Sequence, residues 1–201
     1  GGMECIDIDT KYDLTKTLFD RYKKLISDND KNLLKKLLVE QSVSGGYHFI
    51  YRCSTTEGNQ KLAKRPSTIE EQNETYQTRL AKFLSEGVAP ILAESRAQKA
   101  KINDKVKGLI ETRGEGGYFV CAPMPNYKII YGSFDKINTI SVEERDILLQ
   151  CAITFNEWFE PVKEKRVYKE NYTKSTSNPF EDYNQRADML AFLQNEGWEL
   201  I

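Results

Sequence analysis

Two aspartates stand two residues apart near the start of the chain, in the segment Met3–Asp9, which reads MECIDID. Side chains alternate along a β-strand, so Asp7 and Asp9 would leave one face of a sheet while Ile6 and Ile8 enter a core on the other. Neighbouring carboxylates repel each other unless a cation lies between them, and a hard ion such as Mg²⁺ suits such a pair. Two such ions about 3.5–4 Å apart serve in-line phosphoryl displacement. Taken alone, the pattern is more typical of a polar strand end at a sheet rim.

A third acid, Glu111, lies in the segment Leu109–Arg113, directly before the glycine-rich turn 114–117. Strand alternation puts Glu111 and Arg113 on one face. The acid would complete a metal-binding set, and the guanidinium could hold a phosphate through two parallel hydrogen bonds. Judged alone, this stretch is an ordinary exposed Glu/Arg face beside a hairpin turn.

The only histidine, His48, follows Gly45 and Gly46 in the strand-like run 47–53. Glycines before a strand let a ligand approach the backbone closely, and their N–H groups can meet an anion. A histidine at this place can donate a hydrogen bond to a phosphate oxygen. A single histidine also leaves few options for the base that a nucleophilic serine or cysteine needs. On this stretch alone, a half-buried histidine paired with a backbone carbonyl is the commoner case.

These three stretches need a sheet to bring them together, and hydrophobic periodicity predicts one. Strands are expected at 3–9, 38–42, 47–53, 109–113, 118–122 and 126–132. Helices are expected at 13–25, 33–37, 67–107, 141 to about 159, and 178–197. This order predicts an α+β domain in which helices cover one face of an antiparallel sheet.

Capping residues set the expected helix boundaries. Asp13 is expected to cap a helix whose apolar side begins at Leu14. Ser67–Glu70 and Ser141–Glu144 each read as a capping box, in which two side chains satisfy free backbone N–H groups at a helix start. The polar region 67–107 is expected to be a helical insertion with a solvated charged face and no catalytic role.

Composition narrows the function classes. The chain has 201 residues, a net charge of −1 and a pI near 6.0, which argues against a basic surface that grips duplex DNA but leaves room for a local patch. No apolar run approaches the roughly 20 residues of a membrane helix, so no membrane association is predicted. The four cysteines lack the spacing of a zinc site, and the three that lie in strand-like runs, Cys5, Cys53 and Cys121, are predicted to be buried, reduced thiols. A cytoplasmic location is therefore predicted.

Taken together, the three stretches resemble the primase-polymerase branch of the archaeo-eukaryotic primase superfamily, as found in phages and mobile elements. The resemblance rests on ECIDIDTKYD at 4–13, SGGYHFIY at 44–51 and LIETRGEGGYFVCAP at 109–123, in this order. In that branch the first motif is a DxD strand, the second a histidine after glycines, and the third an acid before RGxGGY. GNQKLA at 58–63 and EDYNQRADMLAFLQNEGW at 181–198 also resemble segments of such proteins.

The resemblance implies an RRM-like fold for residues 3–162 and metal-dependent nucleotidyl transfer for primer synthesis. It implies that the catalytic, Mg²⁺- or Mn²⁺-binding residues are Asp7, Asp9 and Glu111. It implies that the nucleotide-binding residues are Ser44, Gly45, Gly46, His48 and Arg113. The implied partners are a DNA template, nucleoside triphosphates and a replicative helicase, which would be fused through the linker and helix 163–201 or separate.

Family members carry an αβ module before the DxD strand, whereas six residues precede Asp7 here. The expectation is therefore the RRM-like half of such a catalytic core, with weak activity by itself. The alternative is a non-catalytic replication module that binds nucleic acid or a helicase on its sheet. A metal nuclease would share the carboxylates but would not explain the SGGYH and RGEGGY turns.

Overall fold

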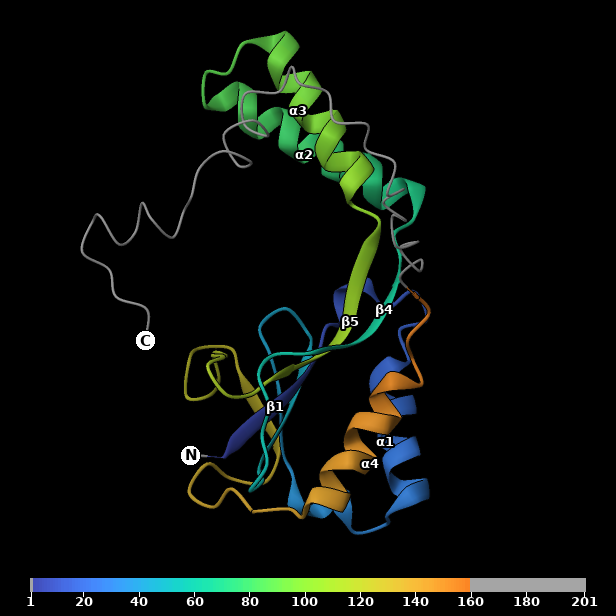
Figure 1. Cartoon of the computed structure of the whole chain (residues 1–201). Helices are drawn as coiled ribbons and strands as arrows, with labels where there is room; N and C mark the ends of the chain where they lie inside the picture. The colour runs from blue at the N-terminus through green and yellow to red at the C-terminus, as the bar shows by residue number, and fades with distance from the viewer. Residues whose placement is uncertain (1, 160–201) are drawn as a thin grey trace, which may run out of the picture. The chain divides into compact units, whose positions relative to one another are not determined.

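A computed structural model describes residues 2–159, which build a six-stranded antiparallel sheet with helices (Figure 1). The strands are β1 (Met3–Ile8), β2 (Leu38–Gln41), β3 (Tyr47–Arg52), β4 (Lys61–Pro66), β5 (Val106–Arg113) and β6 (Lys128–Tyr131). Their order in the sheet is β4-β5-β1-β3-β2-β6. The strands that carry the three sequence motifs, β5, β1 and β3, are therefore neighbours. The predicted C-terminal segment 163–201, with its helix, lies outside the described residues.

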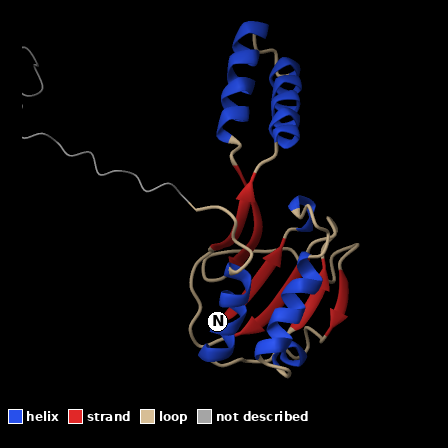
Figure 2. Cartoon of the chain, turned by 90° about the vertical axis from the view of Figure 1, so that its right-hand side faces the viewer, coloured by secondary structure: helices blue, strands red, loops and turns tan. Residues whose placement is uncertain are grey.

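Two helices, α1 (Leu18–Asn29) and α4 (Val142–Ile153), lie against one face of the sheet (Figure 2). Ile6 and Ile8 of β1 belong to the buried core on this face, together with Tyr22 of α1 and Leu148 of α4. Two short 3-10 helices, η1 (Thr10–Tyr12) and η2 (Leu33–Lys36), join these elements. The predicted α+β fold, with helices covering one face of an antiparallel sheet, is confirmed.

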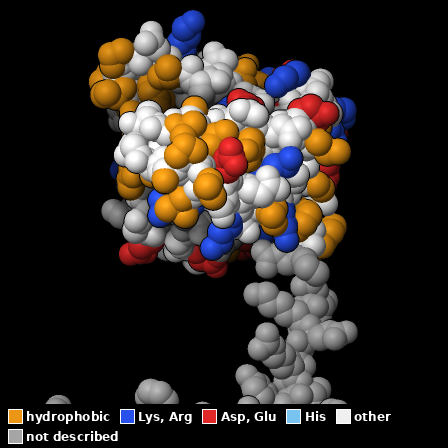
Figure 3. Space-filling view, turned by 90° about the horizontal axis from the view of Figure 1, so that it is seen from above, with side chains coloured by type: hydrophobic (Ala, Val, Ile, Leu, Met, Phe, Trp, Pro, Cys, Tyr) orange, Lys and Arg blue, Asp and Glu red, His pale blue; other side chains and the backbone are white. Residues whose placement is uncertain are grey.

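The predicted helical region 67–107 is a hairpin of two helices, α2 (Ile69–Ser85) and α3 (Pro90–Asn103). Gly87 adopts a positive φ of 79°, and Pro90 begins the second helix, because proline fits the first helical turn and not a helix interior. The capping box is one residue later than predicted, since Thr68 pairs with Glu71. Figure 3 looks onto this end of the molecule and shows hydrophobic side chains among charged ones, in agreement with the 85% exposure of Ile91.

The predicted strand 118–122 is wrong, because this segment does not pair with any strand. Tyr118 is 87% exposed, and the Ala122 N–H donates to the side chain of Glu40 at 3.0 Å instead of to a backbone carbonyl. The predicted strand 126–132 is confirmed within narrower limits as β6, which pairs with β2 at the edge of the sheet.

The start of α1 differs from the prediction. The helix begins at Leu18 with Thr17 as its N-cap residue, because Lys16 has a positive φ of 56° that a helix does not accommodate. Asp13 still caps the helix from outside, since its Oδ2 accepts the Leu18 N–H at 2.9 Å. Leu14 is consequently 65% exposed instead of forming part of the apolar side.

The capping box of α4 is confirmed, because Ser141 and Glu144 each accept the backbone N–H of the other. The helix ends at Ile153, before the predicted end, where the chain turns back to the sheet. There Asn156 Oδ1 accepts the backbone N–H of Lys64 in β4 at 2.9 Å.

Cys5 and Cys53 are buried free thiols, as predicted, whereas Cys121 is partly exposed, so its predicted burial is wrong. Cys151 in α4 is also a buried free thiol. Burial raises the pKa of the Cys5 thiol, so the group stays protonated and packs as a small apolar side chain. None of the helices between residues 2 and 159 is both long enough and apolar enough to cross a membrane.

Candidate functional site

The register of the sheet puts four ionisable side chains in one row. Asp7 on β1 stands opposite Glu111 on β5 and opposite His48 on β3, and His48 stands opposite Glu40 on β2. Residues directly opposite each other in antiparallel strands project from the same face. Because Ile6 faces α1 and α4, the row occupies the other face of the sheet.

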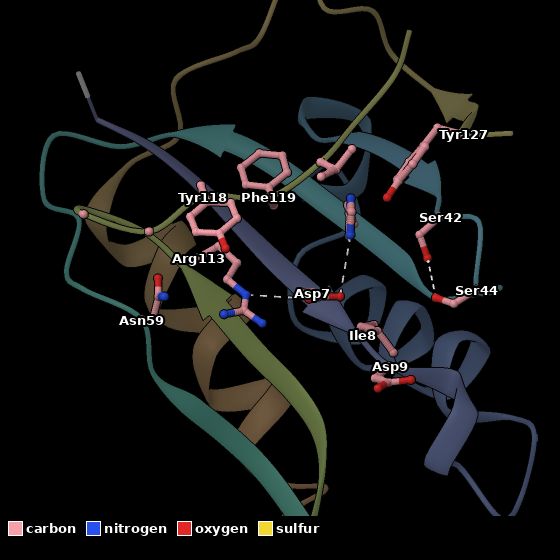
Figure 4. Close-up of a pocket in the computed structure, with 15 residues that line it drawn as sticks. Asp7, Ile8, Asp9, Ser42, Ser44, Asn59, Arg113, Tyr118, Phe119 and Tyr127 are labelled. Carbon is pink, nitrogen blue, oxygen red and sulfur yellow. Dashed lines mark hydrogen bonds and ion pairs between the residues drawn. The ribbon is translucent and has the colours of Figure 1, made fainter. Parts of the chain in front are cut away.

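A pocket of about 420 Å³ opens over this row (Figure 4). The predicted site residues that line it are Asp7, Asp9, Ser44, Gly46, His48 and Arg113. Glu111 and Gly45 do not line it. Glu111 Oε1 instead lies over Gly108, only 3.0 Å from where a Cβ would stand, and Gly45 borders a separate depression with Phe19. The pocket therefore unites two of the three predicted carboxylates with the predicted histidine and arginine.

Arg113 lies between the two acids of β1 and β5. Its Nη2 is 3.1 Å from Glu111 Oε2, and its Nε is 3.8 Å from Asp7 Oδ2. The Arg113 side chain is 32% exposed and lines the pocket together with Asp7. This position allows the arginine to exchange these contacts for an anion of the ligand.

The negative charge of the Asp7 carboxylate is only partly balanced by its neighbours. Its Oδ1 lies 3.6 Å from His48 Nε2, which is longer than a hydrogen bond (Figure 4). Burial raises the pKa of Asp7; Asp9 and Glu111 reinforce this effect, whereas His48 and Arg113 oppose it. The local field therefore favours a further positive charge at this carboxylate.

Glu40 is the residue of the row that sequence reasoning missed. It is 0% exposed, and its Oε1 lies 2.7 Å from His48 Nδ1. The sequence contained part of a signal for it, the turn around Gly45 and Gly46 that joins the two predicted strands. In the structure the Ser42 N–H donates to the Gly46 carbonyl, and counting back along both strands from this pair places Glu40 opposite His48. In the alternative interpretation of this stretch, a backbone carbonyl would pair with His48, whereas the structure pairs the ring with the side chain of Glu40.

The glycines before His48 serve the backbone of the turn. Gly45 has a positive φ of 87°, and its N–H donates to the Ser42 carbonyl at 3.0 Å. The expectation that this N–H meets an anion is therefore wrong. A Cβ on Gly46 would stand 2.6 Å from the Ile8 carbonyl oxygen, so only glycine allows the turn to pack on the end of β1. The turn brings the Ser44 side chain to the pocket.

The glycine-rich turn after Arg113 is held by Glu57 and by the segment that follows it, which reads GNQKLA. A Cβ on Gly114 would stand 1.9 Å from the Glu57 carbonyl oxygen, and one on Gly117 would stand 2.1 Å from Asn59 Oδ1. These close approaches require glycine and bring Asn59 to the rim of the pocket. Sequence reasoning did not assign Asn59 to the site, although it had noted the segment that contains it.

Aromatic side chains form one wall of the pocket. The Phe119 ring stands edge-on to the His48 ring with centroids 5.6 Å apart, and the Tyr127 ring lies 6.1 Å from it. Tyr118 also borders the pocket and is largely exposed (Figure 4). A polar floor and an aromatic wall together suit a ligand with a charged part and a flat part.

The donor chemistry fits a hard cation that is shared with a bound substrate. Between residues 2 and 159, no group of three or more His, Cys, Asp or Glu side chains is arranged to hold a metal ion. Asp7 and Asp9 nevertheless line one pocket, and Mg²⁺ commonly binds one or two carboxylates together with substrate phosphates.

Comparison with protein-family models, with curated proteins and with solved structures finds no match for this chain. Its function is therefore inferred from the row of Asp7, His48 and Glu111 and from the pocket over it.

Proposed function

We propose that this protein is a primase-polymerase, which joins nucleoside triphosphates on a DNA template. The observation that carries the proposal is the register in which Asp7 stands opposite both Glu111 and His48. Three segments that are far apart in the sequence meet through it at the centre of one sheet, and a glycine turn follows or precedes two of them. This arrangement agrees with the resemblance to the primase-polymerase branch, in which these segments form one site.

The residues of the pocket take separate roles in this proposal. The oxygens of Asp7 and Asp9 would hold Mg²⁺ or Mn²⁺, which when bound neutralises phosphate charge and activates a primer hydroxyl. His48, in its protonated form, donates a hydrogen bond from Nε2 to the triphosphate. Arg113 reaches the same phosphates with its guanidinium and is held in place by Glu111 at 3.1 Å. Tyr118 offers an aromatic face on which a base can stack.

The test combines nucleotide binding with primer extension. A fluorescent nucleoside triphosphate is titrated with and without Mn²⁺, and extension is measured on a primed single-stranded DNA template. We expect metal-dependent binding and weak metal-dependent extension, both of which Asp7→Asn and Asp9→Asn abolish. The matched control is Asp146→Asn, which makes the same change at an exposed position of α4.

The outcomes separate the alternatives. Binding of DNA that does not respond to Mn²⁺, with no extension, would favour a non-catalytic replication module. Metal-dependent shortening of the DNA would favour a nuclease. A replicative helicase as partner, and action in the cytoplasm, follow from the proposal and stay predictions.

A further inference from the structure

Glu40 connects two parts of the pocket although it does not line the pocket itself. Its Oε1 lies 2.7 Å from His48 Nδ1, and its Oε2 accepts the Ala122 N–H at 3.0 Å. The first contact reaches β3, and the second reaches the end of segment 118–122, whose residues form the aromatic wall. One buried carboxylate thus joins the histidine to the wall that packs against it.

We propose that Glu40 is a positioning residue for His48, which holds the ring with its proton on Nδ1 and with Nε2 toward Asp7 and the pocket. The inference rests on the proposed function, in which His48 binds the triphosphate. An ionised carboxylate only accepts hydrogen bonds, so with Glu40 ionised it is Nδ1 that donates across the contact of 2.7 Å. A carboxylate on one ring nitrogen fixes the tautomer and the ring orientation, and leaves the other nitrogen for the ligand.

The surroundings make this orientation the favoured one. His48 is 5% exposed, and turning its ring over would put a C–H group against Glu40 Oε1 and leave this buried oxygen without a partner. Phe119 packs edge-on against the ring, and the bond from Ala122 to Glu40 holds the segment that contains this phenylalanine. Loss of Glu40 would therefore release the ring and the wall together.

The test uses the fact that His48 is the only histidine of the chain, so ¹⁵N-labelled protein gives one imidazole spectrum. In the wild-type protein, we expect the neutral ring to carry its proton on Nδ1. Glu40→Leu has a similar shape but no acceptor, so we expect the neutral ring to lose its preference for a proton on Nδ1. Without the carboxylate the ring is also no longer held with Nε2 toward the pocket, so we expect the affinity for nucleoside triphosphate to fall about tenfold.

The matched control is Tyr51→Phe, which removes a buried hydrogen bond on the opposite face of β3, the strand that carries His48. We expect this variant to keep the wild-type imidazole spectrum and the wild-type nucleotide affinity. A Tyr51→Phe spectrum that shifts like that of Glu40→Leu would show a general effect of destabilisation and would overturn the proposal.

Two further results would overturn it. A wild-type neutral ring with its proton on Nε2 would mean that Glu40 donates instead of accepting, and this measurement needs no variant to fold. An unchanged spectrum in folded Glu40→Leu would show that other contacts orient the ring. If the wild-type protein binds no nucleotide, the proposed function fails, whereas the imidazole spectrum still decides the role of Glu40.

Discussion

Two carboxylates of β1, Glu4 and Asp7, face opposite sides of the sheet and are paired very differently. Glu4 is 0% exposed and accepts hydrogen bonds from Arg145 at 2.6 and 2.9 Å and from the Tyr51 hydroxyl at 2.6 Å. Asp7 has a side chain that is 27% exposed, and it lies 3.6 Å from His48 Nε2. We call the helix-side cluster of Glu4, Tyr51 and Arg145 closed, because its carboxylate is buried and fully hydrogen-bonded. We call the pocket-side cluster of Asp7, His48, Glu111 and Arg113 open, because Asp7 is partly exposed and has only longer contacts.

The difference separates a structural ion pair from the proposed binding site. In the closed cluster, the hydrogen bonds to Glu4 raise the pKa of Arg145, and burial raises that of Tyr51, so both partners keep their protons. In the open cluster, burial raises the pKa of Asp7, so the charged carboxylate is held at a cost. Groups held in an unfavourable state at a pocket mark functional sites more often than groups that are fully paired.

The largest expected effect is the loss of the closed cluster. Arg145→Met leaves the buried charge of Glu4 without a counterion, and we expect the free energy of unfolding to fall by about 3–5 kcal/mol in urea denaturation. The double variant Glu4→Leu/Arg145→Met removes both charges and should recover part of this loss. A single variant as stable as the wild type would show that the cluster is not closed in solution.

A third ion pair, at the base of the α2–α3 hairpin, tests whether close pairing has the same meaning away from the sheet centre. Arg65 donates two hydrogen bonds to Glu71, at 2.8 and 2.5 Å, and these lower the pKa of Glu71 from 4.5 to about 2. A lowered carboxylate pKa stabilises the fold above 4.5, and this contribution is lost as the pH falls toward 2. Because solvent screens this partly exposed pair, we expect a loss on the order of 1–2 kcal/mol.

The control for this prediction is Glu71→Gln, which retains the capping box but not the charge. Urea denaturation across this pH range should show a shallower decline in the free energy of unfolding for the variant, because the variant lacks the contribution of Glu71. Some decline remains, because other carboxylates titrate in both proteins. Parallel curves for the two proteins would mean that the ion pair does not contribute in solution.

The sequence was sufficient to predict the strands whose two faces differ in polarity. In β1 and β3, isoleucine, phenylalanine and tyrosine alternate with Asp7 or His48, so the period of two fixes both the element and the face. The box at Ser141 was equally readable, because capping depends on neighbouring residues. These features are local, and local features can be read from a sequence.

The missed features depend on contacts between distant residues. Segment 118–122 has strand-like side chains, yet its Ala122 N–H bonds to Glu40, which lies far away in the sequence. The position of Arg113 between Asp7 and Glu111 likewise depends on side-chain conformation across two strands. Alternation placed the residues on the correct face but did not show which acid the arginine contacts.

A smaller effect is expected from the arginine of the open cluster. Arg113→Met removes contacts of 3.1 and 3.8 Å at a side chain that is 32% exposed, so we expect the free energy of unfolding to fall by less than about 1 kcal/mol. The same substitution at Arg145 provides the comparison. In Arg113→Met, the free energy of nucleoside triphosphate binding should weaken by more than the free energy of unfolding falls. Equal destabilisation by the two variants would remove the distinction between closed and open clusters.

The smallest effect on stability is expected from Asp7→Asn, although this residue lies at the centre of the site. Burial disfavours its charge, and without it Arg113 still contacts Glu111 while His48 still contacts Glu40. We therefore expect a free energy of unfolding within about 0.5 kcal/mol of the wild type or above it, because surface-like changes that leave no buried group unpaired have effects of this size. Urea denaturation at neutral pH measures it. A loss of several kcal/mol would place Asp7 with Glu4 as a structural acid and would contradict the open pairing from which its binding role is inferred.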